Sequence, residues 1–106
     1  MIVNTLEEHK GEDILVLDIS KIAEFADYFI LCSGTSDRML NSLADALTET
    51  LKKNKVQVAK REGLPAEGWI IVDAGDVIIH LFSPEKREFY QIEQLWAQGK
   101  TLVHFR

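Results

Sequence analysis

The pattern of apolar and polar residues predicts three strands in the first part of the chain. Ile14–Ile19 is a predicted strand, and Tyr28–Cys32 is nearly all apolar, which is typical of a strand covered on both faces. Val56–Arg61 alternates apolar with polar residues, so we expect a strand at the edge of a sheet.

A hairpin follows these strands. Trp69–Asp73 and Val77–Phe82 are predicted strands joined at Ala74-Gly75, and Gly75 can adopt the positive φ of a tight turn. The hairpin brings the predicted number of strands to five.

The longest predicted helix spans Asp37–Lys53. The turn Ser33–Ser36 precedes it and supplies a cap, and Asp37 suits the positive end of the helix dipole. A core-facing stripe recurs at helical spacing: Leu40, Leu43, Ala44, Leu47 and Leu51. A short first helix is expected around Thr5 and Glu8, which match a capping box.

The last predicted helix begins at Ser83-Pro84-Glu85, which combines a cap, a first-turn proline and an early acid. Gly99 is expected to end it. One face carries Phe89, Ile92, Leu95 and Trp96, and we expect Leu95 and Trp96 in the core.

The order of these elements predicts an α+β fold with a mixed five-stranded sheet and flanking helices. We expect a single domain over residues 1–106. The tail Thr101 to Arg106 is expected to be either an extra strand or a loose end.

The composition fits a compact globular protein and limits its partners. The chain has 12 Lys and Arg against 17 Asp and Glu, a net charge of −5. This argues against nonspecific nucleic-acid binding, which needs many phosphate contacts, but allows docking onto a basic protein. No apolar run reaches the ~20 residues that cross a bilayer, and Cys32 is the only cysteine, so we expect a cytoplasmic protein.

Four sequence blocks resemble those of the ribosomal silencing factor, or Iojap-related, family. They are ADYFILCSGTSDR at 26–38, REGLP at 61–65, GWIIVDAGDVIIH at 68–80 and REFYQIEQLW at 87–96. Four blocks in the right order are far more specific than any single short motif.

The resemblance implies a nucleotidyltransferase-like fold without catalysis or a cofactor. It implies binding to the large ribosomal subunit through ribosomal protein number fourteen, which blocks subunit joining and represses translation under nutrient limitation. Mitochondrial and plastid members act in ribosome assembly, so a large-subunit assembly factor using the same surface is the alternative. Family members are often dimeric, so we expect a homodimer when the protein is free, with at most minor contact to rRNA.

A catalytic nucleotidyltransferase needs a Gly-Ser turn and a carboxylate pair on the next strand, which hold Mg²⁺ beside substrate phosphates. Here the turn is Gly34-Thr35-Ser36, at a helix start that can bind an anion. The next strand offers only Glu62, preceded by Lys60 and Arg61, whose charges repel a metal ion. The sequence favours a non-enzymatic protein, with a nucleotide-binding relic as the rival.

Asp73 and Asp76 flank the hairpin turn and allow three interpretations. They can form a metal-binding pair, satisfy local backbone N–H groups, or present an acidic hairpin end to a basic protein. The last two are compatible with each other, and both are favoured over a metal site.

Trp69 opens the hairpin after Gly68 and is either an ordinary packing residue or a binding hot spot. The resemblance implies that this tryptophan and the strand after it contact the ribosomal protein. We therefore expect a partner-binding site at Trp69, Ile70, Asp73 and Asp76.

The remaining candidates favour structural roles. Cys32 lies in a buried strand without an adjacent base, which predicts an inert thiol. His80 interrupts an apolar strand and is expected to be a hydrogen-bonded core or interface residue. A solvated helix end, not an rRNA patch, is the preferred account of the basic set Lys52, Lys53, Lys55, Lys60 and Arg61.

Overall fold

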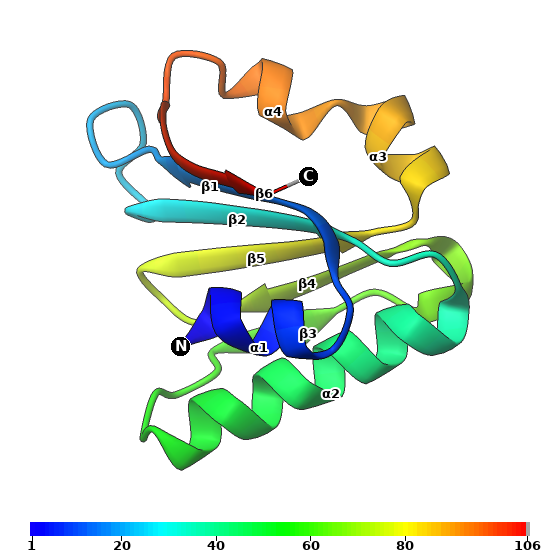
Figure 1. Cartoon of the computed structure of the whole chain (residues 1–106). Coiled ribbons are helices and arrows are strands. Elements are labelled where there is room, and N and C mark those ends of the chain that lie inside the picture. Colours follow the sequence, from blue (N-terminus) through cyan, green and yellow to red (C-terminus); the bar gives the residue numbers. More distant parts are fainter. Residues whose placement is uncertain (106) are drawn as a thin grey trace.

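The computed structural model describes residues 1–105, which form three layers (Figure 1). A six-stranded mixed sheet is the middle layer. Helices α1 (Ile2–Glu8) and α2 (Asp37–Lys53) lie on one side of it, and α3 (Pro84–Tyr90) and α4 (Ile92–Leu95) lie on the other. The expected α+β class is therefore confirmed.

The sheet has the strand order β3-β4-β5-β2-β1-β6. Its strands are β1 (Glu12–Asp18), β2 (Tyr28–Ser33), β3 (Lys60–Glu62), β4 (Trp69–Asp73), β5 (Val77–Phe82) and β6 (Lys100–Phe105). Only the central pair β2 and β5 is parallel, and the other neighbours are antiparallel. The expected hairpin is confirmed with the bounds that the sequence predicts.

The predicted number of five strands is wrong, because the tail adds a sixth. Residues Lys100–Phe105 form β6, which pairs with β1 through partners such as Val16 and Val103. Of the two alternatives for Thr101 to Arg106, the extra strand is the observed one, and Arg106 lies outside the described residues.

Helix α2 has the predicted bounds. The Oγ of Ser36 accepts a hydrogen bond from the backbone N–H of Met39 at 3.1 Å, which caps the helix as expected. The leucines of the predicted stripe are fully buried against the sheet. In the described part of the chain, neither α2 nor any other helix combines the length and apolar character that crossing a membrane requires.

The edge strand is shorter than predicted. Only Lys60–Glu62 pairs with β4, whereas Val56 and Val58 pack on the core from an irregular segment. The backbone N–H of Val56 bonds to the carbonyl of Leu51 at 2.8 Å, so this residue closes the end of α2 and does not enter the sheet.

The single last helix is also a wrong prediction, because Gln91 takes a left-handed φ of +48° and divides it into α3 and α4. Phe89 before the break and Leu95 after it both face outward, with 76% and 74% of their surface exposed. Trp96 packs on the second core cluster as expected, but Leu95 does not.

The capping box at Thr5 is not formed. Met1 is the N-cap residue of α1, so Thr5 lies inside the helix, where its hydroxyl donates to the carbonyl of Met1 at 2.9 Å.

The two faces of the sheet are covered to different extents. The larger core cluster lies between the sheet and α1 and α2. The opposite face carries a smaller cluster that includes Leu17, Phe29 and Phe82, and Trp69 and Trp96 are only partly buried against it. This less covered face contains the candidate site.

Candidate functional site

The alternation of β4 divides the predicted site residues between the two faces of the sheet. Ile70 and Val72 are fully buried toward α2, whereas Trp69, Ile71 and Asp73 face the other side and are half-buried. Ile70 was expected to contact a partner. Its side chain has no exposed surface, so that expectation is wrong for Ile70, which is a core residue.

Trp69 is held in a cluster of rings. Its ring lies 4.9 Å from that of Phe82 on β5, in a stacked arrangement, and 4.6 Å from that of Tyr90 on α3, measured between centroids. Its indole Nε1–H donates a hydrogen bond to Nδ1 of His80 at 3.3 Å. These contacts fix the orientation of the indole while leaving part of it accessible to solvent.

His80 is the buried acceptor of that hydrogen bond. Burial lowers the pKa of His80 from 6.5 to about 4, so the imidazole is neutral at physiological pH and Nδ1 is free to accept. Its Nε2 has no hydrogen-bond partner among the described residues. The expectation of a hydrogen-bonded core histidine is confirmed.

An open pocket of about 470 Å³ lies beside Trp69, between β4, α3 and the loop after β3. Its floor includes Trp69 and Ile71. The short 3₁₀ helix η1 (Pro65–Glu67) forms one wall and α3 another. The lining residues are Glu62, Gly63, Ala66, Glu67, Trp69, Ile71, Lys86 and Tyr90. We refer to this cavity as the Trp69 pocket.

Two glycines allow the loop that forms one wall of the Trp69 pocket to pack closely against Trp69 and Ser83. Gly63 has a φ of +93°, and a Cβ there would lie 2.1 Å from the carbonyl oxygen of Trp69. Gly68 ends η1 with a φ of +73°, and a Cβ there would lie 2.7 Å from Oγ of Ser83. The loop backbone is therefore fixed in a conformation that favours glycine at both positions.

At the acidic end of the hairpin, Asp73 stabilises the turn between β4 and β5. The carboxylate of Asp73 accepts a hydrogen bond from the backbone N–H of Gly75 at 2.8 Å, as the turn interpretation predicts. Asp76 is exposed, and its carbonyl accepts from the backbone N–H groups of Asp27 and Tyr28. Within residues 1–105, no three His, Cys, Asp or Glu side chains are grouped as metal ligands.

The turn Gly34-Thr35-Ser36 is occupied by structural contacts. Gly34 is buried, its N–H donates to the carbonyl of Phe82 at 2.8 Å, and Ser36 caps α2. On β3, the carboxylate of Glu62 is ion-paired with Lys60. The only acid of β3 is thus ion-paired with a lysine, and no second carboxylate lies on this strand.

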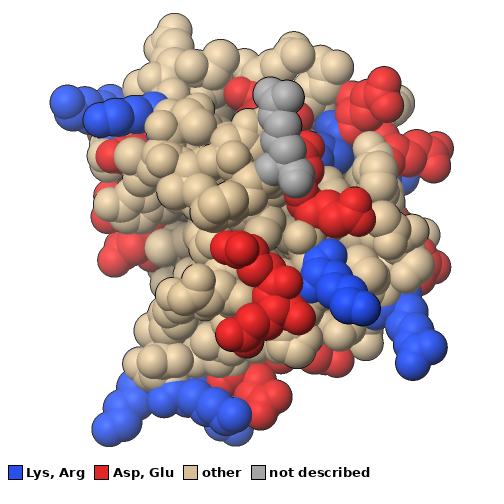
Figure 2. All heavy atoms as spheres, in the orientation of Figure 1, with Lys and Arg blue, Asp and Glu red and all other residues tan. Residues whose placement is uncertain are grey.

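The basic residues near the end of α2 and on β3 are largely paired with acids. Lys53 lies 3.3 Å from Glu49, and Arg61 lies 2.9 Å from Asp45. In the view of Figure 2, lysine and arginine side chains form separate groups with acidic side chains between them. This agrees with a solvated surface, as expected.

Cys32 faces the larger core cluster and has no exposed surface. Burial raises the pKa of its thiol to about 12, so the thiol is protonated at neutral pH. An inert thiol was expected, and these properties agree with it.

Sequence reasoning missed Arg87, which is buried and holds α3 on the sheet. Its Nη1 donates to Oγ of Ser33 at 3.0 Å and to the carbonyl of Asp13, and its Nε lies 3.4 Å from the carboxylate of Glu93. These contacts position α3 and with it Tyr90, which lines the pocket. An arginine inside the REFYQIEQLW block was the only signal in the sequence.

Comparisons with known proteins agree with one another. The family model described as "Ribosomal silencing factor during starvation" matches residues 1–105. The chain is 39% identical over 93 residues to the ribosomal silencing factor RsfS of Bacillus subtilis, which covers 88% of this chain and 79% of that protein. It is 37% identical over 100 residues to mouse "Mitochondrial assembly of ribosomal large subunit protein 1", and the match covers 92% of this chain and 44% of that protein. A crystal structure of a Chromobacterium violaceum protein matches with a TM-score of 0.89 and 36% identity, covering 98% of this chain and 86% of that one.

Proposed function

Because this chain belongs to the ribosomal silencing factor family, we propose that it binds the large ribosomal subunit through ribosomal protein number fourteen and blocks subunit joining. The contact surface in this proposal is the docking face, which we define as Trp69, Ile71, Asp73, Asp76 and Tyr90. Repression of translation under nutrient limitation then follows from steric exclusion of the small subunit.

The observation that carries the proposal is the state of Trp69. The indole is half-buried, stacked on Phe82 and hydrogen-bonded to His80, yet part of it remains open to a partner. A tryptophan held in this way offers a large contact area with little conformational entropy left to lose, which is the property of a binding hot spot.

The acidic residues of the docking face would steer and orient a basic partner protein. Asp76 is exposed at the hairpin end, and the carboxylate of Asp73 lies beside it in the same turn. Negative charge near the anchor steers a basic protein surface toward it and sets its orientation, with a smaller contribution to affinity. A net charge of −5 supports the same kind of partner.

We propose action by binding and not by catalysis. The turn at Gly34 is occupied by helix and strand contacts, and Glu62 is paired with Lys60. The nucleotide-binding rival predicts that a nucleotide with Mg²⁺ raises the melting temperature of the protein, because a ligand that binds only the folded state stabilises it.

A role in large-subunit assembly is the second candidate. It is favoured by the name of the mouse relative, an assembly protein of the mitochondrial large subunit. Both roles use the docking face, so they differ in timing and not in contacts. Depletion of the protein from growing cells separates the two roles. Loss of an assembly factor leaves stalled large-subunit precursors, whereas loss of a silencing factor does not.

The remaining parts of the proposal are a cytoplasmic location and a homodimer in the absence of ribosomes. Analytical ultracentrifugation of the free protein tests the dimer directly.

Co-sedimentation with separated large and small ribosomal subunits tests the proposed function. The proposal predicts that the protein pellets with large subunits and not with small ones. Equal binding to both subunits, or to neither, contradicts it.

A further inference from the structure

We propose that the Trp69 pocket receives an arginine side chain of the docked partner protein. The inference deepens the proposed function and rests on it, since the pocket adjoins Trp69 and Tyr90 of the docking face. It adds a specific chemical requirement on the partner, which the docking face alone does not set.

The first argument is charge. Glu62 and Glu67 both line the pocket, against one cation, Lys86. The Nζ of Lys86 lies 5.8 Å from the ring centroid of Phe89 on the same helix. Glu62 is already paired with Lys60, whereas Glu67 makes no ion pair within residues 1–105. Glu67 is therefore the carboxylate that remains open to an incoming cation, and a lining with two acids and one lysine disfavours a phosphate, so a protein side chain fits better than RNA.

The second argument is the aromatic lining. The rings of Trp69 and Tyr90 are tilted by 44° with centroids 4.6 Å apart, and both border the cavity. Aromatic faces attract cations, tryptophan most strongly. A guanidinium can stack on such a face with its plane and at the same time donate two hydrogen bonds to a carboxylate, which a lysine ammonium cannot do. The combination of rings and Glu67 thus favours arginine.

The third argument is that the pocket is already formed. Its volume of about 470 Å³ falls in the range of small-ligand sites, which is about 300–1,000 Å³, so a long side chain and some water fit inside. The wall that carries Glu67 is fixed by Gly63 and Gly68, whose positive φ angles place η1 against Trp69 and α3. A preformed site needs little ordering when the ligand arrives.

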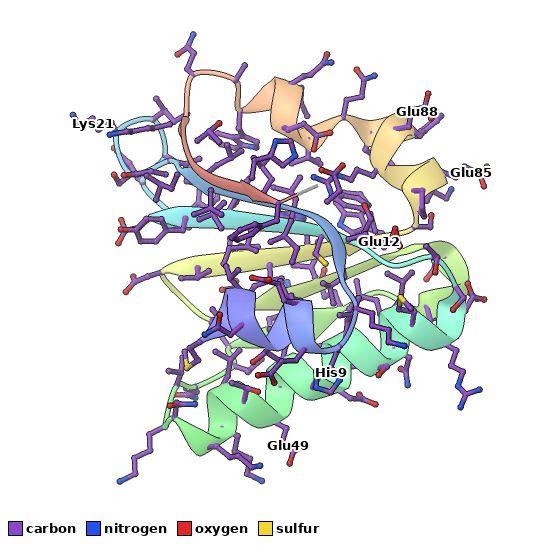
Figure 3. All side chains as sticks on the ribbon, in the orientation of Figure 1. His9, Glu12, Lys21, Glu49, Glu85 and Glu88 are labelled. Atoms are coloured by element: carbon purple, nitrogen blue, oxygen red, sulfur yellow. The ribbon has the colours of Figure 1, made fainter. Side chains whose placement is uncertain are left out.

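The first test compares two isosteric substitutions that each remove one negative charge. Glu67→Gln changes the pocket, and Glu49→Gln changes α2, on the opposite side of the sheet from α3 (Figure 3). We expect Glu67→Gln to weaken binding to large subunits about tenfold, as for loss of one charge-assisted hydrogen bond. Glu49→Gln should change it less than about twofold. Equal effects of the two substitutions would overturn the inference.

The second test does not depend on the ribosome. Acetyl-Gly-Arg-Gly-amide is added to the wild-type protein while the NMR signal of the Trp69 indole N–H is followed, and the citrulline peptide, a neutral isostere, is the control. We expect a saturating shift with the arginine peptide, a smaller one with a lysine peptide and none with citrulline. Equal shifts with arginine and citrulline, or no shift with either, contradict the inference. If the wild-type protein fails to bind large subunits, the proposed function fails, and this titration still decides the chemistry of the pocket.

Discussion

Trp69 and His80 are joined by a hydrogen bond in which the indole Nε1–H donates to Nδ1 of the imidazole at 3.3 Å. The bond links a half-exposed residue at the start of β4 to a buried residue of β5. The indole therefore has a defined orientation in the free protein, so the proposed docking would cost it little rotational freedom.

His80 makes the stability of the protein depend on pH. Burial holds the pKa of His80 at about 4 in the folded state, against 6.5 as the ordinary value, so the unfolded chain binds the proton more readily. The contribution of His80 is complete above pH 6.5 and is lost as the pH falls through the window from 6.5 to 4, by about 3 kcal/mol in total. Urea unfolding of the wild type and of His80→Gln at several pH values in this window measures the difference. A variant with an unchanged pH slope would contradict the assignment.

Removal of the indole should weaken docking strongly. We expect Trp69→Ala to weaken binding to large subunits by ~2 kcal/mol or more, because hot-spot tryptophans dominate interfaces. Trp96→Ala is the matched control, since Trp96 packs on the same face against Phe25 and Phe29 but lies outside the docking face. Circular dichroism confirms that each variant is folded. Equal losses in the two folded variants would show that Trp69 has no special role.

Alanine substitutions at Gly63 and Gly75 distinguish the cost of a positive φ from the cost of a steric clash. Both have positive φ, but a Cβ at Gly63 would collide with the carbonyl of Trp69, whereas no described heavy atom lies within 4 Å of one at Gly75. Gly75→Ala should therefore destabilise the protein by about 1–2 kcal/mol, the strain of the left-handed conformation alone. Gly63→Ala should cause a larger loss and displace the pocket wall. Denaturant titration compares the two, and a smaller effect at Gly63 would be the contrary result.

The buried guanidinium of Arg87 should contribute more to the stability of the fold than the exposed one of Arg61. Arg87→Met removes the contacts to Ser33, Asp13 and Glu93 that hold α3 on the sheet. We expect a loss of about 2–3 kcal/mol in the free energy of unfolding, below the value for fully buried pairs because Asp13 and Glu93 are partly exposed. Arg61→Met, which breaks a surface pair with Asp45, should lose less than about 1 kcal/mol. Comparable losses measured in urea for both variants would argue against a special role for Arg87.

The elements that were predicted correctly are those with strong local signals. Helix α2 begins at a serine cap and carries leucines at helical spacing, and the hairpin turns at a glycine with positive φ. The pattern within each segment is enough to place them.

The elements that were missed depend on distant contacts. Strand β6 forms because β1 offers it an edge. Helix α3 ends at Tyr90, and the turn at Gln91 lets Arg87, Ile92 and Trp96 all contact the sheet. No local pattern at Gln91 signals a left-handed residue, since glutamine has no preference for that conformation.

The residues of the proposed site were predicted only in part. Trp69 and the hairpin acids were proposed from the sequence and the family resemblance. Ile70 was grouped with them, although it follows Trp69 directly in a strand and so lies on the opposite, buried face of β4. Lys86 and Tyr90 reach the pocket from α3, so their proximity to Trp69 required the tertiary structure.

A subunit-joining assay tests the central claim most directly. Separated large and small subunits are mixed with wild-type protein, Trp69→Ala or Trp96→Ala, and the fraction of joined ribosomes is measured by sedimentation. The proposed mechanism predicts that wild-type protein and Trp96→Ala reduce joining, whereas Trp69→Ala leaves it near the level without protein. Normal joining in the presence of wild-type protein bound to the large subunit would contradict it and favour an assembly role.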